Sequence, residues 1–124
     1  VFRVFDRDIV KCKEVRSSDH WVDFNFFGHQ LVIHHKPKEA ETNHYVNKVD
    51  GQQVPVPHFG IILSWENFKT FSEHLKHKKV KFIIKPYIRF KGLAGEQATL
   101  FFYDPSGNAL EFKAFKNSSH IFSK

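Results

Sequence analysis

The sequence predicts an α+β fold, and three observations support this. Phe accounts for fifteen of the 124 residues and Met for none, which indicates an aromatic core of the kind that β-sheets bury. Short β-prone segments bounded by Gly, Asp, Ser and Pro recur along the chain. One segment, residues 65–78, carries apolar side chains at helical spacing, with charged residues on its other face. The sequence therefore predicts one long helix among several strands.

The first half is predicted to consist of short strands and turns. The expected strands cover residues 1–5, 11–16, 20–26 and 31–34. Residues 17–19 and Gly28 provide the turns between the later strands. Residues 36–54 are polar and charged, with Asp50 and Gly51 as a turn signal, so we expect a linker or long loop there.

The second half is predicted to run strand, helix, strand, strand, strand. Ser64 is a suitable N-cap, and Glu66 in the first turn suits the helix dipole. Pro86 is expected near the end of the strand that follows the helix. The expected strands of this half cover residues 57–63, 79–87, 96–103 and 108–115, and the helix covers residues 65–78.

The last two strands are joined by the most specific turn signal in the chain, residues 104–107 (Asp-Pro-Ser-Gly). Pro fixes φ, Gly supplies a positive φ and Asp bonds its own backbone, so a tight hairpin is expected. In the strand that leaves the turn, Leu110 and Phe112 share one face, and Glu111 and Lys113 share the other. A carboxylate in mid-strand between apolar residues is costly to bury alone. Glu111 is therefore expected to meet a cation.

The two halves end alike, which indicates an internal duplication. Residues 27–34 align with residues 106–113, sharing Gly and Leu, and an aromatic strand precedes each segment. Two copies of one small unit are the simplest explanation, and a duplicated fold usually places its site between the copies.

Charge and composition limit the partners and the compartment. The net charge of +6 and the pI near 9.5 favour anionic partners, but Lys is spread along the chain, so nucleic acid is not expected. Cys12 is the one cysteine, which excludes an internal disulfide and fits a reducing compartment. Because the sequence has neither an apolar run of ~20 residues nor a signal peptide, it predicts a cytoplasmic protein with no membrane partner.

The order strand–helix–strand–strand–strand, taken twice, with a His early in the second unit and a Glu on its last strand, resembles the vicinal oxygen chelate superfamily. This group contains glyoxalase I, extradiol dioxygenases, fosfomycin-resistance enzymes and bleomycin-binding proteins. The matching residues are 56–60 (Val-Pro-His-Phe-Gly) and 107–112 (Gly-Asn-Ala-Leu-Glu-Phe), and the hairpin 101–108 is the most specific part. The resemblance covers nearly the whole chain and is strongest over residues 55–115.

The resemblance implies two βαβββ modules that form a curved mixed sheet around a cup, in one glyoxalase/dioxygenase-like domain. The expected parts are module one at residues 1–35, the linker at 36–54 and module two at 55–124. The first module lacks room for its helix, because Ile9 almost adjoins Lys11. We therefore expect segments to be missing before Val1 and between Ile9 and Lys11.

The resemblance also implies a divalent metal cofactor, iron or manganese first, with nickel or zinc as alternatives. His58 and Glu111 match two of its ligands, and an imidazole with a carboxylate suits these metals. Val32 takes the corresponding position of the first module and cannot bind metal, and residues 1–5 contain no His. The third ligand is therefore expected just before Val1.

Other side chains are candidates for the chemistry and for substrate binding. A phenol can shuttle a proton, and Tyr103 is the predicted catalytic residue. The predicted substrate-binding residues are Arg89, Gln97, Gln30, His34 and Phe102. For the two metal-ligand candidates, the residues alone leave simpler interpretations open. These are a hydrogen bond to a neighbour for His58, and a salt bridge with Lys113, Lys85 or Arg89 for Glu111.

The sequence thus predicts a metal-dependent enzyme of the glyoxalase/dioxygenase type that chelates adjacent oxygens of a small-molecule substrate. Both dioxygenase and lyase or isomerase chemistry are compatible with this prediction, and two His with one Glu favour the dioxygenase. The alternative is a non-catalytic ligand- or drug-binding protein of the bleomycin-resistance kind. A basic single-strand-binding module, suggested by aromatic and basic residues within 82–90, is a weaker third interpretation. A homodimer would be unsurprising in this family.

Overall fold

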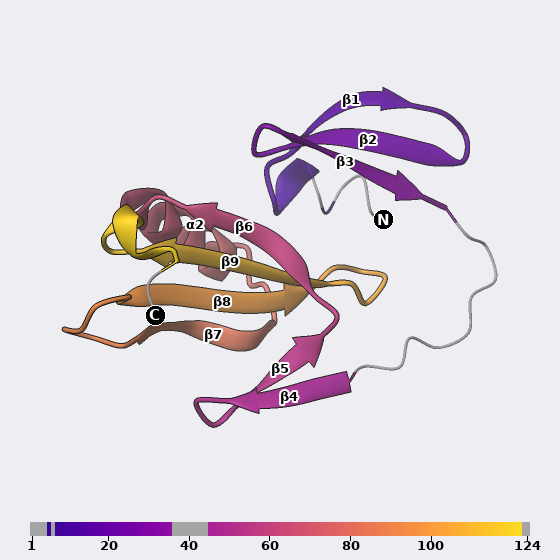
Figure 1. Cartoon of the computed structure of the whole chain (residues 1–124). Coiled ribbons are helices and arrows are strands. Elements are labelled where there is room, and N and C mark those ends of the chain that lie inside the picture. Colours follow the sequence, from indigo (N-terminus) through magenta and orange to yellow (C-terminus); the bar gives the residue numbers. More distant parts are fainter. Residues whose placement is uncertain (1–4, 6, 36–44, 123–124) are drawn as a thin grey trace. The chain divides into compact units, whose positions relative to one another are not determined.

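The computed structural model of the chain describes residues 5, 7–35 and 45–122, and Figure 1 traces its elements. The chain divides into two compact units, residues 1–43 and residues 44–124. Both units contain β-sheet and the second adds a long helix, so the α+β prediction is confirmed. In the parts that are described, no helix is long and apolar enough to cross a membrane.

The first unit contains a three-stranded antiparallel sheet in the order β1-β2-β3. Its strands are β1 (Lys13–Ser17), β2 (Trp21–Phe26) and β3 (His29–His34). Alternation along β2 sends Val22, Phe24 and Phe26 to one buried face. The strand predicted for residues 1–5 is not observed at Phe5, which is helical, and residues 1–4 lie outside the described residues.

The second unit contains the predicted order strand, helix, strand, strand, strand. Its elements are β6 (Phe59–Leu63), α2 (Trp65–His77), β7 (Phe82–Arg89), β8 (Gln97–Tyr103) and β9 (Ala109–Phe115), followed by the short 3-10 helix η1 (Ser118–His120). The sheet order is β6-β9-β8-β7, with β6 parallel to β9 and the other pairs antiparallel. This arrangement matches the βαβββ module expected for this half.

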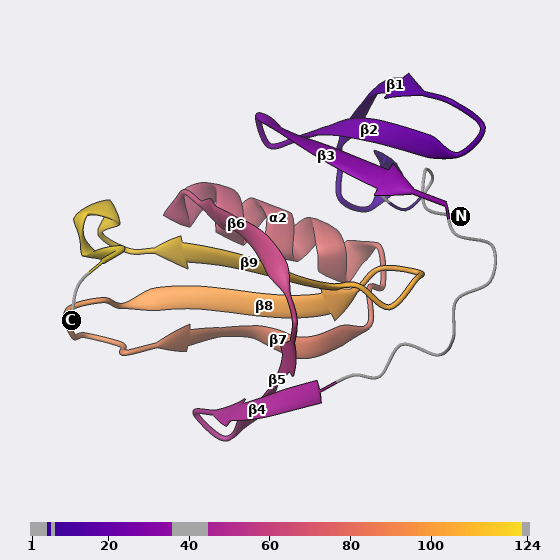
Figure 2. The same ribbon diagram turned by 45° about the vertical axis from the view of Figure 1, so that its right-hand side comes forward.

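Helix α2 covers one face of the four-stranded sheet, as Figures 1 and 2 show. Ser64 caps the helix, because its hydroxyl accepts a backbone N–H of the first turn at 3.1 Å. In the sheet, Phe112 is completely buried, with its ring 4.6 Å from that of Phe71 on the helix and 5.7 Å from that of Phe102. Alternation along β9 therefore leaves Glu111, the neighbour of Phe112, on the opposite face of the sheet.

A hairpin precedes this sheet where a linker was predicted. Its strands are β4 (Tyr45–Val49) and β5 (Gln52–Val56), which pair antiparallel around the predicted Asp50–Gly51 turn. The linker prediction is wrong from residue 45 onward, and its first part, residues 36–44, lies outside the described residues. The Asp50 carboxylate accepts a hydrogen bond from Arg89 and one from Tyr87 at 3.5 Å. These contacts tie the hairpin to β7, and no local sequence pattern reveals them.

Candidate functional site

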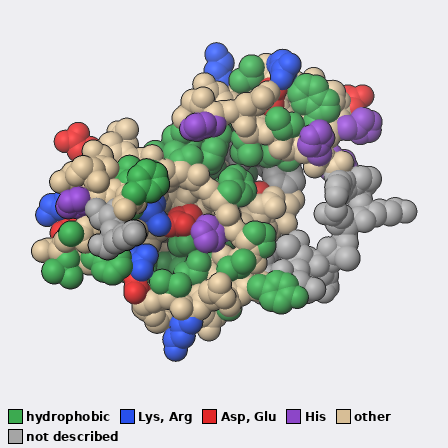
Figure 3. All heavy atoms as spheres, in the orientation of Figure 1, with side chains coloured by type: hydrophobic (Ala, Val, Ile, Leu, Met, Phe, Trp, Pro, Cys, Tyr) green, Lys and Arg blue, Asp and Glu red, His purple; other side chains and the backbone are tan. Residues whose placement is uncertain are grey.

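The sheet face opposite α2 in the second unit carries a group of polar side chains. The register pairs Glu111 with Phe101 of β8, and pairs Lys113 with Thr99. Directly paired residues point to the same side, so these four side chains lie together on what we call the site face. His58, just before β6, joins them through a contact with Glu111. Figure 3 shows an acidic side chain and a histidine next to each other on this unit.

His58 and Glu111 face each other on the site face. The Nε2 atom of His58 lies 3.0 Å from Oε2 of Glu111, and its Nδ1 atom lies 2.8 Å from the Pro55 carbonyl oxygen. Because a carbonyl oxygen only accepts, Nδ1 carries a hydrogen, and the neutral imidazole presents its Nε2 lone pair to the carboxylate. Two acceptors at this distance repel each other unless a cation lies between them. The pair is therefore arranged to hold a proton or a metal ion.

The second carboxylate oxygen of Glu111 is held by other partners. Its Oε1 atom accepts a hydrogen bond from the Thr99 hydroxyl at 3.0 Å, and the Lys113 ammonium lies 3.0 Å away. The Glu111 side chain is only 15% exposed, so these donors take the place of water. The salt bridge with Lys113 that the sequence suggested is present. It coexists with the His58 contact because the two partners use different oxygens.

The described residues bring together two metal donors, not three. Among them, no three His, Cys, Asp or Glu side chains are placed to hold one metal ion. The third ligand was expected before Val1, which lies outside the described residues. His58 and Glu111 nevertheless fit one side of a metal centre, because the Pro55 carbonyl orients the imidazole as outer partners orient metal-binding His residues.

Arg89 lies on β7 and is bound to a carboxylate of the β4–β5 hairpin. Its guanidinium donates to Asp50, which Tyr87 also contacts. Burial raises the pKa of the Tyr87 phenol; the charge of Arg89 opposes this, and the charges of Asp50 and Glu111 reinforce it. The predicted substrate-binding role of Arg89 would therefore require its release from Asp50.

The other predicted residues of this unit have different surroundings. Tyr103 ends β8 on the same side as Phe101 and is half-buried. Gln97 is 7% exposed; its amide donates to the Gly95 carbonyl at 3.3 Å, and its Oε1 atom has no hydrogen-bond partner within the described residues. Phe102 is completely buried on the helix side of the sheet. Its prediction as a substrate-binding residue is wrong, because alternation sends it to the opposite side from Phe101.

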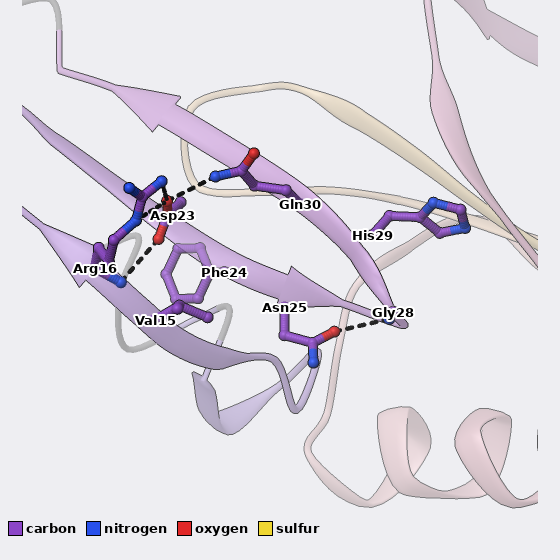
Figure 4. A pocket seen from close by; sticks show the side chains of 8 residues that line it. All are labelled: Val15, Arg16, Asp23, Phe24, Asn25, Gly28, His29 and Gln30. Carbon is purple, nitrogen blue, oxygen red and sulfur yellow. Dashed lines mark hydrogen bonds and ion pairs between the residues drawn. The ribbon is translucent and has the colours of Figure 1, made fainter.

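In the first unit, Gln30 belongs to a network around the buried carboxylate of Asp23 (Figure 4). The Oδ2 atom of Asp23 accepts from Nε and Nη2 of Arg16 at 3.0 and 2.7 Å, and from Nε2 of Gln30 at 2.8 Å. Its Oδ1 atom accepts the backbone N–H of Arg16 at 2.8 Å. These three residues and His29 line a cavity of about 370 Å³. Gln30 thus orients Asp23, while His34 lies exposed at the end of β3.

Sequence reasoning missed Asp23, and it missed the contact of Thr99 with Glu111. A carboxylate in mid-strand between apolar residues is the pattern that pointed to Glu111. Asp23 has the same pattern, because it lies between Val22 and Phe24 on β2, so the sequence could have revealed it. Thr99 has no comparable signal, because its contact with Glu111 depends on the register between β8 and β9.

Replacing Asp23 with Asn is expected to lower the melting temperature at neutral pH and to weaken its dependence on pH. Burial opposes ionisation of Asp23, but hydrogen bonds from Arg16 and Gln30 outweigh it, so its pKa lies below the ordinary value in the folded state. The stabilisation is therefore complete above the unfolded-state pKa of about 4 and is lost as the pH falls through the folded-state pKa. Thermal unfolding between about pH 7 and about pH 2 measures this. The exposed Asp19→Asn is the control, and equal acid sensitivity of D23N and wild type would contradict the expectation.

Comparison with known proteins identifies structural relatives. No protein-family model matches the sequence, and no curated protein does. Among solved structures, the chain is similar to a glyoxalase/bleomycin resistance protein/dioxygenase from Alicyclobacillus acidocaldarius. The two are 29% identical, the alignment covers 96% of this chain and 86% of that one, and the TM-score is 0.71.

Two further solved structures share the fold at lower identity. A mutant of the fosfomycin resistance protein FosX from Listeria monocytogenes, complexed with Mn(II) and 1S,2S-dihydroxypropylphosphonic acid, is 17% identical. That alignment covers 99% of this chain and 87% of the other, with a TM-score of 0.68. Lactoylglutathione lyase from Agrobacterium tumefaciens is 14% identical over 92% of this chain and 83% of that one, with a TM-score of 0.60. These two similarities concern the fold alone.

Proposed function

We propose that this chain is a metal-dependent enzyme of the glyoxalase/dioxygenase type, because it belongs to the vicinal oxygen chelate superfamily. His58 and Glu111 would bind a divalent metal, and two adjacent oxygens of a small-molecule substrate would chelate that metal. One observation carries the proposal. The Nε2 atom of His58 and Oε2 of Glu111 face each other at 3.0 Å, while Nδ1 is committed to the Pro55 carbonyl.

The donor set fits a divalent transition metal. Imidazole nitrogen and carboxylate oxygen suit iron and manganese first, and nickel or zinc as well. Such a metal supplies Lewis acidity, which lowers the pKa of a coordinated hydroxyl or enol and stabilises negative charge on its oxygen. The FosX complex supports manganese as a candidate, because that relative was solved with Mn(II).

The chain's own side chains would position this centre. The Pro55 carbonyl sets the ring of His58 so that Nε2 points at Glu111. Thr99 and Lys113 hold Oε1 of Glu111, which leaves Oε2 as the oxygen for a metal.

We further propose Tyr103 as the residue that carries a proton, since its half-buried phenol lies on the same side of β8 as the site face. Four polar side chains remain candidates for substrate binding, two in each unit. They are Arg89 and Gln97 in the second unit, and Gln30 and His34 in the first.

A non-catalytic ligand-binding protein of the bleomycin-resistance kind is the second candidate. The number of ligands favours it, because the described residues bring together His58 and Glu111 without a third donor. Such a protein would bind its ligand equally well with and without metal.

Elemental analysis of the protein purified without chelator tests the enzyme proposal. We expect near-stoichiometric iron or manganese, and oxygen consumption when catechols are added. Nickel or zinc would instead direct the activity screen to isomerase and lyase substrates. If the metal-stripped protein binds none of these ions in a titration, the enzyme proposal fails and the ligand-binding candidate remains.

We also infer a cytoplasmic location and a homodimeric assembly. Cys12 is buried and forms no disulfide, which supports a reducing compartment. Analytical ultracentrifugation tests the dimer, because a sedimentation mass equal to that of one chain would contradict it.

A further inference from the structure

The two oxygens of Glu111 have different surroundings, and the difference points to a role for Lys113. Oε2 faces Nε2 of His58 at 3.0 Å, whereas Oε1 is shared by the Thr99 hydroxyl and the Lys113 ammonium, each at 3.0 Å. Lys113 follows Glu111 by two residues on β9, so both side chains lie on the site face. Its side chain is only 26% exposed, so solvent ions screen its charge weakly. A positive charge is therefore held beside the candidate metal position.

That positive charge changes the electrostatics of the site. The charges of Glu111 and Lys113 cancel, and His58 is neutral when its Nε2 lone pair is free to bind a metal. The three residues together are therefore neutral, and the site with a divalent metal bound would carry a net charge of about +2. Lys113 repels the metal, while Lys113 and the metal together attract a negatively charged ligand. The first effect weakens metal binding and the second strengthens binding of an anion.

We propose that Lys113 makes this centre selective for anionic oxygen chelators. The inference rests on the proposed function and adds a substrate class to it. Lys113 lowers the affinity of the empty site for a divalent metal, and it raises the affinity of the loaded site for a ligand with two negatively charged oxygens. Small molecules whose adjacent oxygens are both negative when bound are therefore favoured over neutral diols.

One substitution separates charge from packing at this position. Lys113→Met removes the ammonium and keeps an unbranched aliphatic side chain. Thr99 still donates to Oε1 of Glu111, so the carboxylate keeps one of its two anchors. Lys113→Arg restores the charge. Lys116→Met is the matched control, because it removes one charge just after β9, where Lys116 is 63% exposed and pairs with Glu96 at 3.5 Å.

Calorimetric titration of the full chain measures both effects. Metal-stripped protein is titrated with Mn²⁺, and the Mn²⁺-loaded protein is then titrated with oxalate, a chelator with two negative oxygens. For Lys113→Met we expect the Kd for Mn²⁺ to fall about tenfold and the Kd for oxalate to rise about tenfold. Lys113→Arg and Lys116→Met should stay within about twofold of wild type for both ligands.

The opposite changes distinguish this role from structural damage, which would weaken binding of both ligands. Weaker binding of both, or no change in either, would overturn the inference and leave the metal site in place. If the wild-type protein binds no Mn²⁺, the proposed function itself fails and the inference fails with it.

Discussion

Glu111→Gln is expected to raise the Kd for Mn²⁺ by at least about 100-fold. The substitution keeps the shape of the side chain but removes the negative charge that Oε2 presents to Nε2 of His58, 3.0 Å away. Loss of a partner outside the ligand shell typically costs about 10- to 100-fold in metal affinity, so loss of a charged ligand should exceed this. Calorimetric titration of metal-stripped protein measures the Kd.

Glu96→Gln is the matched control, because Glu96 is also a largely buried carboxylate of the second unit. The backbone N–H of Gly92 donates to it at 2.7 Å and lowers its pKa; burial opposes this and the charge of Lys116 assists it. Its charge therefore interacts with Gly92 and Lys116 and not with the side chains of the site face. We expect this variant to bind Mn²⁺ like wild type. Equal Mn²⁺ affinity of Glu111→Gln and wild type would show that Glu111 is not a ligand.

Gly60→Ala is expected to lower the free energy of unfolding by about 3 kcal/mol or more. A Cβ atom at this position would lie 1.6 Å from the backbone carbonyl oxygen of Glu111, the residue that Gly60 pairs with across β6 and β9. Because a backbone atom cannot rotate away, the two strands would have to separate. Thermal unfolding measures the effect, with a melting temperature expected to fall by roughly 10 °C.

The same substitution is expected to impair the site. Gly60 lies between His58, two residues earlier, and Glu111, its partner on β9, so separating the strands moves both candidate ligands. Ile62→Ala on the same strand is the control; Ile62 is 48% exposed, and its loss should cost less than about 1 kcal/mol. A Gly60→Ala protein that melts within about 2 °C of wild type would contradict the strand contact described here.

Local patterns predicted the second unit well and the β4–β5 hairpin poorly. The Ser64 cap, the helical spacing of α2 and the turn at residues 104–107 act within a few residues, so these elements occur where expected. The strands β4 and β5 pair with each other around the predicted Asp50–Gly51 turn, but their polar composition resembles that of a linker. Asp50 at this turn also contacts Arg89, 39 residues away in the sequence, and no local pattern reveals that contact.

The sequence by itself determined which side chains share a strand face. Because a strand has a two-residue period, alternation placed Glu111 with Lys113 and on the side opposite Phe112. Only the tertiary structure decided which partners these side chains meet. His58 and Thr99 reach different oxygens of Glu111 because β6 and β8 pair with β9 in one register. That register depends on contacts between distant parts of the chain, and a shift of one residue would turn the carboxylate to the helix side.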